Sequence, residues 1–208
     1  MADQSRFWNR LADKYAAQPV ADPASYQAKL DDTRRLLLPD MDVFEFGCGT
    51  GTTALTHAPR VRHIRATDFS QRMVEIARTK AEEAGITNVT FEQADITTMA
   101  PTPARYDVVM GHSILHLLPD PQKAIAASFA MLKPGGYFIT STACLAGGPG
   151  LVLGLIAPLG KAFGLLPTIK AFSPKRLEAM HRQTGFAIEK LWQPGKGKAV
   201  FIIARKPV

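Results

Sequence analysis

The stretch Val43-Phe44-Glu45-Phe46-Gly47-Cys48-Gly49-Thr50-Gly51 decides the fold. An apolar run meets an acidic residue and then breaks into alternating glycines. Glycine has no Cβ, so the backbone can turn tightly there and approach a bound ligand closely. Residues 52–57 can open a helix, whose free N–H groups would point back at the loop. A strand, a glycine loop and a helix start together predict a nucleotide-type cofactor site.

The spacing of the glycines indicates which cofactor. A dinucleotide site requires Gly-x-Gly-x-x-Gly, with the helix N-terminus holding a pyrophosphate. Here the pattern is Glu45-x-Gly47-x-Gly49-x-Gly51. A carboxylate before the loop would repel a pyrophosphate but suit a cationic ligand that carries an amino group. The stretch resembles the first motif of the class I S-adenosylmethionine-dependent methyltransferases. That resemblance implies that Glu45 lies near the methionine moiety and that the loop, with Cys48, passes beside the cofactor.

Length and composition fit one globular domain. The chain has 208 residues, of which 46% are hydrophobic and 21% are charged, as is ordinary for a soluble protein. Two cysteines, Cys48 in the loop and Cys144 at the end of a predicted strand, argue against a disulfide framework and fit a reducing cytoplasm. Residues 1–6 are polar and lack the apolar core of a signal peptide. We therefore expect a cytoplasmic protein.

The net charge of +7 could favour nucleic acid, acidic lipid or an anionic substrate. The basic residues are spread along the chain, and no recognisable nucleic-acid module accompanies them. Solvated surface explains most of them. The sequence therefore predicts no nucleic-acid partner.

Strands and helices alternate along the chain, which predicts a parallel sheet covered on both faces. Ser25 is expected to cap the second helix, Gly85 to end the fourth, and residues 133–136 to form a turn. The last two strands are joined by the turn-rich residues 193–198, which favours an antiparallel hairpin. The expected strands are 42–46, 63–68, 88–93, 106–111, 137–142, 186–192 and 199–204, and the expected helices are 7–15, 25–38, 52–57, 70–84, 121–132 and 174–184.

This order resembles the methyltransferase sheet. It implies an α/β, Rossmann-like, seven-stranded and mostly parallel sheet with an antiparallel last strand, helices on both faces and an apolar cap insertion after strand five. We expect residues 1–208 to form a single methyltransferase domain, in which residues 1–40 form an N-terminal helical lid and residues 145–172 form the cap.

Acidic residues stand at the ends of two further strands, where ligands bind in such sheets. Asp68 can accept hydrogen bonds from two ribose hydroxyls. Its context resembles the family's second motif, which implies that Phe69 or Met73 lies beside the adenine. Asp95 can accept the exocyclic amine of adenine, while Ile96 supplies backbone and apolar contact. The plainer interpretation of Asp95 is a loop acid, and that of Asp68 is a helix N-cap, for which Ser70 is the better candidate.

The end of the fourth strand, Gly111-His112-Ser113-Ile114-Leu115-His116, resembles a segment of small-molecule methyltransferases. It lacks the Asn/Asp-Pro-Pro-aromatic motif of enzymes that methylate amino groups of bases. Gly111 and His112 should lie near the cofactor sulfur. In the N-terminal lid, Tyr15 could close over the pocket and Lys29 could pair the cofactor carboxylate.

Methyl transfer from a sulfonium needs positioning and requires a base only if the nucleophile arrives protonated. His112 and His116 are the candidate bases, because imidazole titrates near neutral pH; packing or orienting roles are the alternatives. The five histidines are scattered, so we predict no metal site.

The segment 145–169, LAGGPGLVLGLIAPLGKAFGLLPTI, carries one charge, Lys161. Its repeated Gly and Pro argue against one straight membrane-spanning helix. Three roles remain open: a lid over a hydrophobic substrate, a homodimer interface, or a peripheral membrane element. As a lid, the cap of residues 145–172 would place five residues on the substrate side: Phe163, Leu165, Leu166, Ile169 and Phe172.

The first functional hypothesis is methyl transfer from S-adenosylmethionine to a small, hydrophobic or lipid-like acceptor. The second is an NAD(P)-dependent oxidoreductase, which the glycine spacing and Glu45 disfavour. The third is a non-catalytic cofactor-binding or interaction protein.

Overall fold

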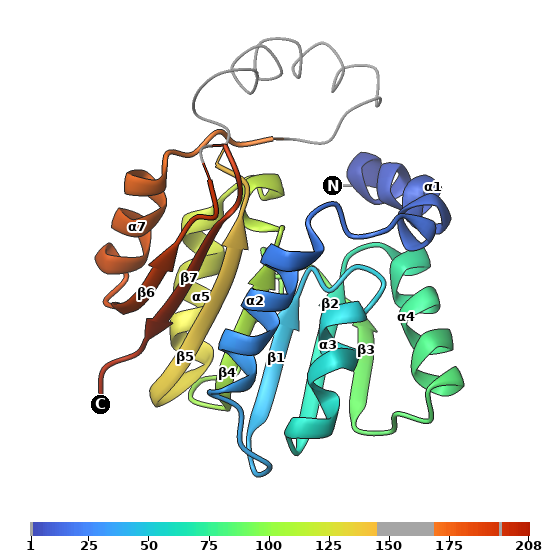
Figure 1. The fold of residues 1–208 in the computed structure, drawn as a ribbon, viewed down its shortest axis with the longest axis horizontal. Helices are drawn as coiled ribbons and strands as arrows, with labels where there is room; N and C mark the ends of the chain where they lie inside the picture. The colour runs from blue at the N-terminus through green and yellow to red at the C-terminus, as the bar shows by residue number, and fades with distance from the viewer. Residues whose placement is uncertain (1, 145–168, 196) are drawn as a thin grey trace.

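A seven-stranded sheet forms the centre of the protein, in the order β3-β2-β1-β4-β5-β7-β6 (Figure 1). The computed structural model describes residues 2–144, 169–195 and 197–208. All neighbouring pairs up to β5 are parallel, and β7 is antiparallel to both β5 and β6. The strands are β1 (Asp42–Phe46), β2 (His63–Asp68), β3 (Val89–Gln93), β4 (Tyr106–His112), β5 (Leu132–Thr142), β6 (Ala187–Trp192) and β7 (Val200–Arg205).

Helices cover both faces of the sheet, as the alternating sequence pattern predicts. On one face Val43 and Ile64 pack against Ala54 of α3 and Ala77 of α4, and on the other Phe44 and Phe138 pack with residues of α5 and α7. The predicted fold, including the reversed last strand, is confirmed. The helices are α1 (Ala2–Ala17), α2 (Pro23–Arg34), α3 (Thr52–His57), α4 (Gln71–Glu83), α5 (Pro121–Met131) and α7 (Pro174–Gln183), with short 3₁₀ turns η1 (Ala58–Arg60) and η2 (Leu115–Leu117).

Helix α2 begins earlier than the sequence indicates. Asp22, not Ser25, is the N-cap: its Oδ1 accepts the Ser25 N–H at 3.1 Å, and Pro23 occupies the first helical position. Proline favours the first position of a helix, and an oxygen acceptor directly before it can accept a free N–H of the first turn. Asp22 is therefore the N-cap in preference to Ser25. The helix then ends at Arg34, four residues before the predicted Leu38.

Strand β5 is longer than expected. Residues 133–136, expected as a turn, belong to the strand, which starts at Leu132. The strand pairing shifts between Tyr106 and Val108, and Gly135 adopts φ +78°. A glycine-bearing irregularity therefore lets the strand continue through what reads as a turn.

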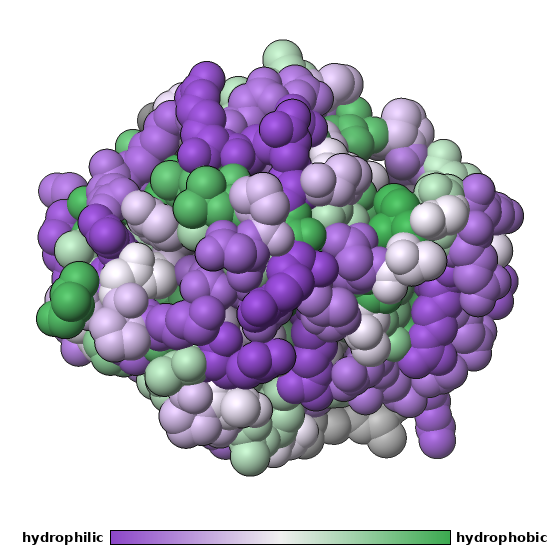
Figure 2. Space-filling model, turned by 90° about the horizontal axis from the view of Figure 1, so that it is seen from below, coloured by the Kyte–Doolittle hydropathy of each residue, from purple (hydrophilic) through white to green (hydrophobic). Residues whose placement is uncertain are grey.

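The two edges of the sheet differ in character. The carboxyl ends of the parallel strands, at the top of Figure 1, lie beside α1 and the start of α2. The opposite edge presents a mainly hydrophilic surface with scattered apolar side chains (Figure 2). The first edge is where an open α/β sheet binds its ligands.

Candidate active site

The glycine loop after β1 has three glycines in the left-handed region, Gly47 at φ +63°, Gly49 at +54° and Gly51 at +77°. A Cβ at Gly47 would lie 2.5 Å from Ile114 Cγ1, and one at Gly51 would lie 2.8 Å from the Ala77 Cβ. At Gly49 the nearest atom is a Tyr15 ring carbon at 3.7 Å. Gly51 thus serves helix packing as the N-cap of α3, whereas Gly49 leaves its backbone open to a ligand.

Two buried carboxyl groups lie under this loop. Glu45 is 2% exposed; one oxygen is hydrogen-bonded to the Ala54 backbone N–H, and Oε2 finds no partner among the described residues. Burial, with the nearby Asp68, raises the pKa of Glu45 to about 8. Asp68 Oδ2 accepts the Gly49 N–H and its Oδ1 accepts the Ser70 N–H, each at 2.9 Å. Burial raises the pKa of Asp68 too, although these backbone hydrogen bonds oppose the shift.

A cavity of about 440 Å³, hereafter the loop cavity, opens above the glycine loop. Its polar lining comes from Asp68, His112, Ser113 and His116, and its aromatic lining comes from α1 and from Phe69. The full set is Trp8, Tyr15, Gly47, Gly49, Asp68, Phe69, Met73, His112, Ser113, Ile114, His116, Leu117 and Ile169. Asp95 lies in a small adjoining pocket that shares Trp8, Phe69, Ile114 and Leu117 with the loop cavity.

The end of β4 contributes the two histidines. Burial lowers the pKa of His112 to about 3 and that of His116 to about 4, so both rings are neutral at pH 7. Within the described part of the chain, His112 Nε2 and His116 Nδ1 have no hydrogen-bond partner. Ser113 follows at φ +56°, and its N–H donates to the Ser141 carbonyl at 2.7 Å. A non-glycine residue held in this region of backbone space marks a functional-site candidate.

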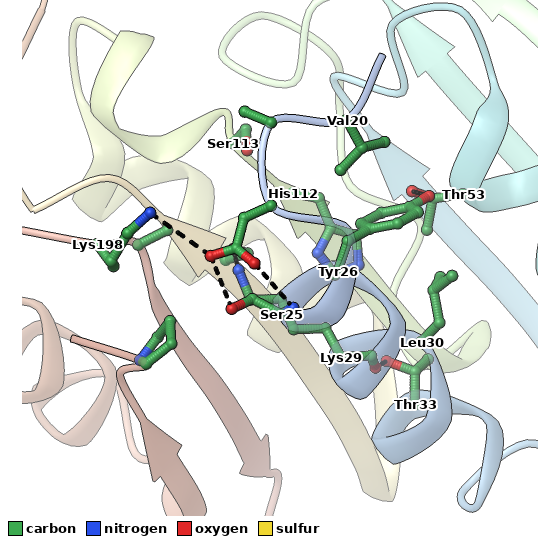
Figure 3. Close-up of a pocket in the computed structure, with 15 residues that line it drawn as sticks. Val20, Ser25, Tyr26, Lys29, Leu30, Thr33, Thr53, His112, Ser113 and Lys198 are labelled. Atoms are coloured by element: carbon green, nitrogen blue, oxygen red, sulfur yellow. Dashed lines mark hydrogen bonds and ion pairs between the residues drawn. The ribbon is translucent and has the colours of Figure 1, made fainter.

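A second cavity of about 320 Å³, hereafter the α2 cavity, lies under α2 (Figure 3). Lys29 donates from Nζ to Ser141 Oγ at 3.0 Å, and burial lowers its pKa. Tyr26 and Thr53 share a hydrogen bond of 3.2 Å that ties α2 to the start of α3. His112 and Ser113 line both cavities, so the end of β4 separates them. The β6–β7 hairpin completes the wall with Pro194, Lys198 and Ala199.

Helix α1 is fixed over the loop cavity by polar contacts with the start of α4. Asn9 Oδ1 accepts hydrogen bonds from Ser70 Oγ at 2.6 Å and from the Arg72 N–H at 3.2 Å. Asp13 forms an ion pair with Arg72 at 2.6 Å. These contacts hold Trp8 and Tyr15, whose rings meet edge to face, against the cavity.

The structure gathers most of the predicted site residues around the loop cavity. Lys29 instead lies in the α2 cavity, Asp95 in the adjoining pocket, and Glu45 beneath the loop. The Cys48 thiol is packed beneath the loop, where burial raises its pKa well above the usual value. Eight predicted residues line the loop cavity: Tyr15, Gly47, Gly49, Asp68, Phe69, Met73, His112 and His116.

Two predicted residues have a packing role that the sequence did not indicate. Ile96 is buried in the core cluster that contains Phe46. A Cβ at Gly111 would lie 2.4 Å from Phe46 Cζ, so the ring of Phe46 requires glycine at this position. Packing alone therefore accounts for the residue type at both positions, and their contact with the cofactor stays a prediction.

The sequence did not single out Trp8, Ser113 and Ser141 as site residues. Trp8 could be read only as part of a helical face, although its spacing from Tyr15 places both rings on one side of α1. Ser141 lines the α2 cavity because β5 lies beside β4 in the sheet, which places Ser141 opposite His112. Spacing along the chain carries no indication of that contact.

Most of the expected apolar cap, residues 145–168, lies outside the described residues. Of the two described residues assigned to its substrate side, Ile169 lines the loop cavity. Phe172 is 3% exposed and belongs to the core cluster with Leu177. The assignment of Phe172 is therefore corrected: Ser173 caps α7, and this start of the helix directs the preceding aromatic ring into the core.

Over residues 2–144, 169–195 and 197–208, no group of three or more His, Cys, Asp or Glu side chains could hold a metal ion. None of the helices in the same ranges is both long and apolar enough to cross a membrane.

A family described as "Methyltransferase domain" matches residues 37–174. Over 106 residues the chain is 32% identical to a ubiquinone biosynthesis O-methyltransferase of Leptothrix cholodnii, covering 50% of this chain and 45% of that protein. The chain spans about half the length of the curated relatives it matches.

Solved structures show the same fold. A putative methyltransferase from Bacillus halodurans superposes with a TM-score of 0.73 at 19% identity, covering 89% of this chain and 100% of that chain. The [4+2]-cyclase SpnF superposes with a TM-score of 0.71 at 20% identity, covering 86% and 80%. The family match extends over the glycine loop, all three strand-end acids and the end of β4. The chain therefore belongs to the methyltransferase domain family, with S-adenosylmethionine as its cofactor.

Proposed function

We propose that the protein transfers the methyl group of S-adenosylmethionine to a small, hydrophobic or lipid-like acceptor. The observation that carries this proposal is the set of acids at successive strand ends around an open glycine loop. Glu45 is the penultimate residue of β1, Asp68 ends β2 and Asp95 follows the end of β3, while Gly49 lines the loop cavity. A buried carboxyl oxygen without a partner, Glu45 Oε2, fits a cofactor that carries an ammonium group.

The residues divide the cofactor among them. In this proposal Asp68 accepts hydrogen bonds from the ribose hydroxyls. Each of its oxygens accepts one backbone N–H and has a second lone pair for a hydroxyl donor. Asp95 accepts a hydrogen bond from the exocyclic amine of adenine, and Ile96, Phe69 and Met73 lie beside the base. Glu45 and Lys29 hold the charged ends of the methionine moiety. The loop residues Gly47, Cys48, Gly49 and Gly51 pass beside the cofactor, as do Tyr15 and Gly111.

The cofactor supplies a methyl group already activated by a sulfonium, so the chain's own residues need only position the acceptor and keep water out. The neutral ring of His112 can take a proton from a hydroxyl acceptor, because its Nε2 has no hydrogen-bond partner among the described residues and the residue lines both cavities. His116 is the second candidate, with an orienting role as its alternative.

The acceptor's character follows from the apolar part of the loop cavity. Trp8, Ile114, Leu117 and Ile169 line it and would favour a hydrophobic molecule. One relative's name, ubiquinone biosynthesis O-methyltransferase, accords with such an acceptor. We propose that residues 145–172 form a lid over the acceptor. The alternatives for this segment are a homodimer interface and a peripheral membrane contact, in a protein that we propose to be cytoplasmic.

An acceptor screen tests the proposal. The intact protein is incubated with S-adenosylmethionine and a panel of phenols, catechols, carboxylic acids and lipids, and S-adenosylhomocysteine is quantified. Product formed only with an acceptor present supports methyl transfer. The panel also reveals which class of acceptor supports turnover.

A non-catalytic cofactor-binding protein is the alternative to keep, because a fold does not fix an activity: the same fold also occurs in a protein described as a [4+2]-cyclase. Calorimetric titration separates the hypotheses. Binding of S-adenosylhomocysteine without turnover on any acceptor would favour this alternative. Binding of NAD(H) in its place would favour an oxidoreductase.

A further inference from the structure

Glu45 occupies a buried position surrounded by groups that cannot neutralise a negative charge. On β1 the flanking side chains Phe44 and Phe46 belong to the core on the α5 face. Glu45 points to the other face, where it is hydrogen-bonded to Ala54 of α3. It is 2% exposed, and Oε2 finds no hydrogen-bond donor in the described ranges.

Four titratable groups from adjoining elements face Glu45. Asp68 of β2 and Cys48 of the loop interact electrostatically with Glu45, and so do Tyr15 of α1 and Tyr26 of α2. Each of these groups is either neutral or negative. They offer no positive charge to an ionised Glu45.

The basic groups nearby do not supply one either. Lys29 of α2 donates from Nζ to Ser141 Oγ at 3.0 Å and is therefore directed to β5. Burial lowers the pKa of His57 of α3 to about 4 and that of His112 of β4 to about 3, so both are neutral at pH 7. Within the part of the chain that the structure describes, no Lys, Arg or His nitrogen lies within 4 Å of the Glu45 carboxyl group. Burying an unpaired carboxylate is so costly that the neutral acid is the stable form of the empty site.

We propose that Glu45 couples cofactor binding to the release of one proton: it is a neutral acid in the free protein and a carboxylate when the ammonium group of the cofactor's amino-acid tail binds. The inference rests on the proposed function. On binding, the O–H bond of the Glu45 carboxyl group breaks, the proton passes to the buffer, and the carboxylate pairs with the ligand ammonium. No electron is transferred. Glu45 thus selects ligands by the charge of the tail.

The sign of the pH dependence follows. Burial raises the pKa of Glu45 in the free protein to about 8, so binding must displace a proton at any pH below that value. Affinity for a ligand with the ammonium group therefore rises with pH up to about 8 and then levels off. Between pH 6 and pH 8 we expect roughly a 50-fold gain. A ligand without the tail should show no such gain.

Isothermal titration calorimetry in phosphate and in Tris at pH 7 measures the proton release. Titration of the wild-type protein with S-adenosylhomocysteine should release roughly 0.9 proton per ligand. Methylthioadenosine, which lacks the amino-acid tail, should release none. Glu45→Gln should bind S-adenosylhomocysteine without proton release, whereas Glu83→Gln, an exposed glutamate on α4, should behave as the wild type.

Equal proton release from wild type and Glu45→Gln would overturn the inference, as would equal release by both ligands. The pH series on the wild-type protein tests the same point without any variant: affinity for S-adenosylhomocysteine that is flat from pH 6 to pH 8 also overturns it. Failure of a folded protein to bind either adenosyl ligand at any pH would instead overturn the proposed function. The two failures are therefore distinguishable.

Discussion

Two neighbouring parts of the site are both buried, and burial shifts the pKa values of their side chains in opposite directions. The acid side, Glu45 and Asp68 under the glycine loop, has raised pKa values, whereas the histidine side, His112 and His116 after β4, has lowered ones. Desolvation is the first cause on both sides, because it always disfavours the charged form. The same burial therefore keeps the proton on Glu45 at neutral pH and keeps protons off the two imidazoles.

The difference lies in what each side can do next. A buried acid gains its charge when a cationic ligand arrives, so the acid side is suited to recognising the cofactor. A buried neutral imidazole with a free nitrogen can accept a proton, so the histidine side is suited to the acceptor. In the proposed function, recognition of the cofactor and the chemistry on the acceptor would therefore lie on adjacent strands, β1–β2 and β4. Substitutions on the two sides should affect different measurements.

The largest expected effect is on turnover, from His112→Asn. Loss of the proton-accepting ring should lower kcat about 300-fold, as for a general base, while affinity for S-adenosylhomocysteine stays within about threefold. Turnover with a protonated hydroxyl acceptor and calorimetric affinity are the two measurements. His116→Asn serves as the comparison variant. A wild-type kcat for His112→Asn would remove the histidine side from the chemistry.

The next effect is on stability, and its sign differs between the two sides. Glu45 has a folded pKa of about 8, above its ordinary 4.5, so the folded state binds more protons and wild-type stability falls as pH rises from 5 to 8. His116 has a folded pKa of about 4, below its ordinary 6.5, so wild-type stability falls as pH drops from 7 to 4.

Urea unfolding of Glu45→Gln and His116→Gln against the wild type measures this difference. Relative to the wild type, Glu45→Gln should gain about 2–3 kcal/mol between pH 5 and pH 8. His116→Gln should gain about 1–2 kcal/mol in the opposite direction, from pH 8 to pH 5. If both differences had the same sign, the contrast between the two sides would be wrong.

Asp68→Asn tests the acid side through the cofactor alone. The amide keeps one acceptor oxygen but cannot accept the hydrogen bonds of Gly49 and Ser70 at both positions. Affinity for S-adenosylhomocysteine should fall about 30-fold, with kcat at saturating cofactor changed much less. Asp40→Asn, on an exposed turn, is the matched control. A kcat loss as large as that of His112→Asn would show that the two sides do not act separately.

The sequence predicts the acid side better than the α2 cavity, for a physical reason. Glycines at positive φ and acids at strand ends are local requirements, so Gly49 and Asp68 can be identified from spacing alone. The α2 cavity depends on long-range contacts such as that of Lys29 with Ser141, 112 residues away. The residues that adjoin Lys29 and Ser141 in the sequence do not indicate this contact.

Local competition explains the remaining errors. Ser25 and Asp22 are both good helix caps, and only the position of Pro23 favours Asp22. Residues 133–136 are expected as a turn because glycine and proline break most strands. Hydrogen bonds of Gly135 and Gly136 with Lys206, just after β7, nevertheless keep them in β5. Phe172 reads as part of an apolar cap because its hydrophobicity does not distinguish a cavity wall from a core.

The smallest expected effect concerns α1, which covers the acid side through exposed contacts. Asp13 pairs with Arg72 at the surface, where an ion pair contributes little. Asp13→Asn should therefore raise the dissociation rate of S-adenosylhomocysteine only about threefold, and high salt should raise the wild-type rate by a similar factor while leaving the variant unchanged. Stopped-flow fluorescence of Trp8, which lines the loop cavity, can measure both rates. A salt effect of equal size in Asp13→Asn would mean that α1 is held by Asn9 and its apolar contacts, and that the Asp13–Arg72 pair plays no part in retaining the cofactor.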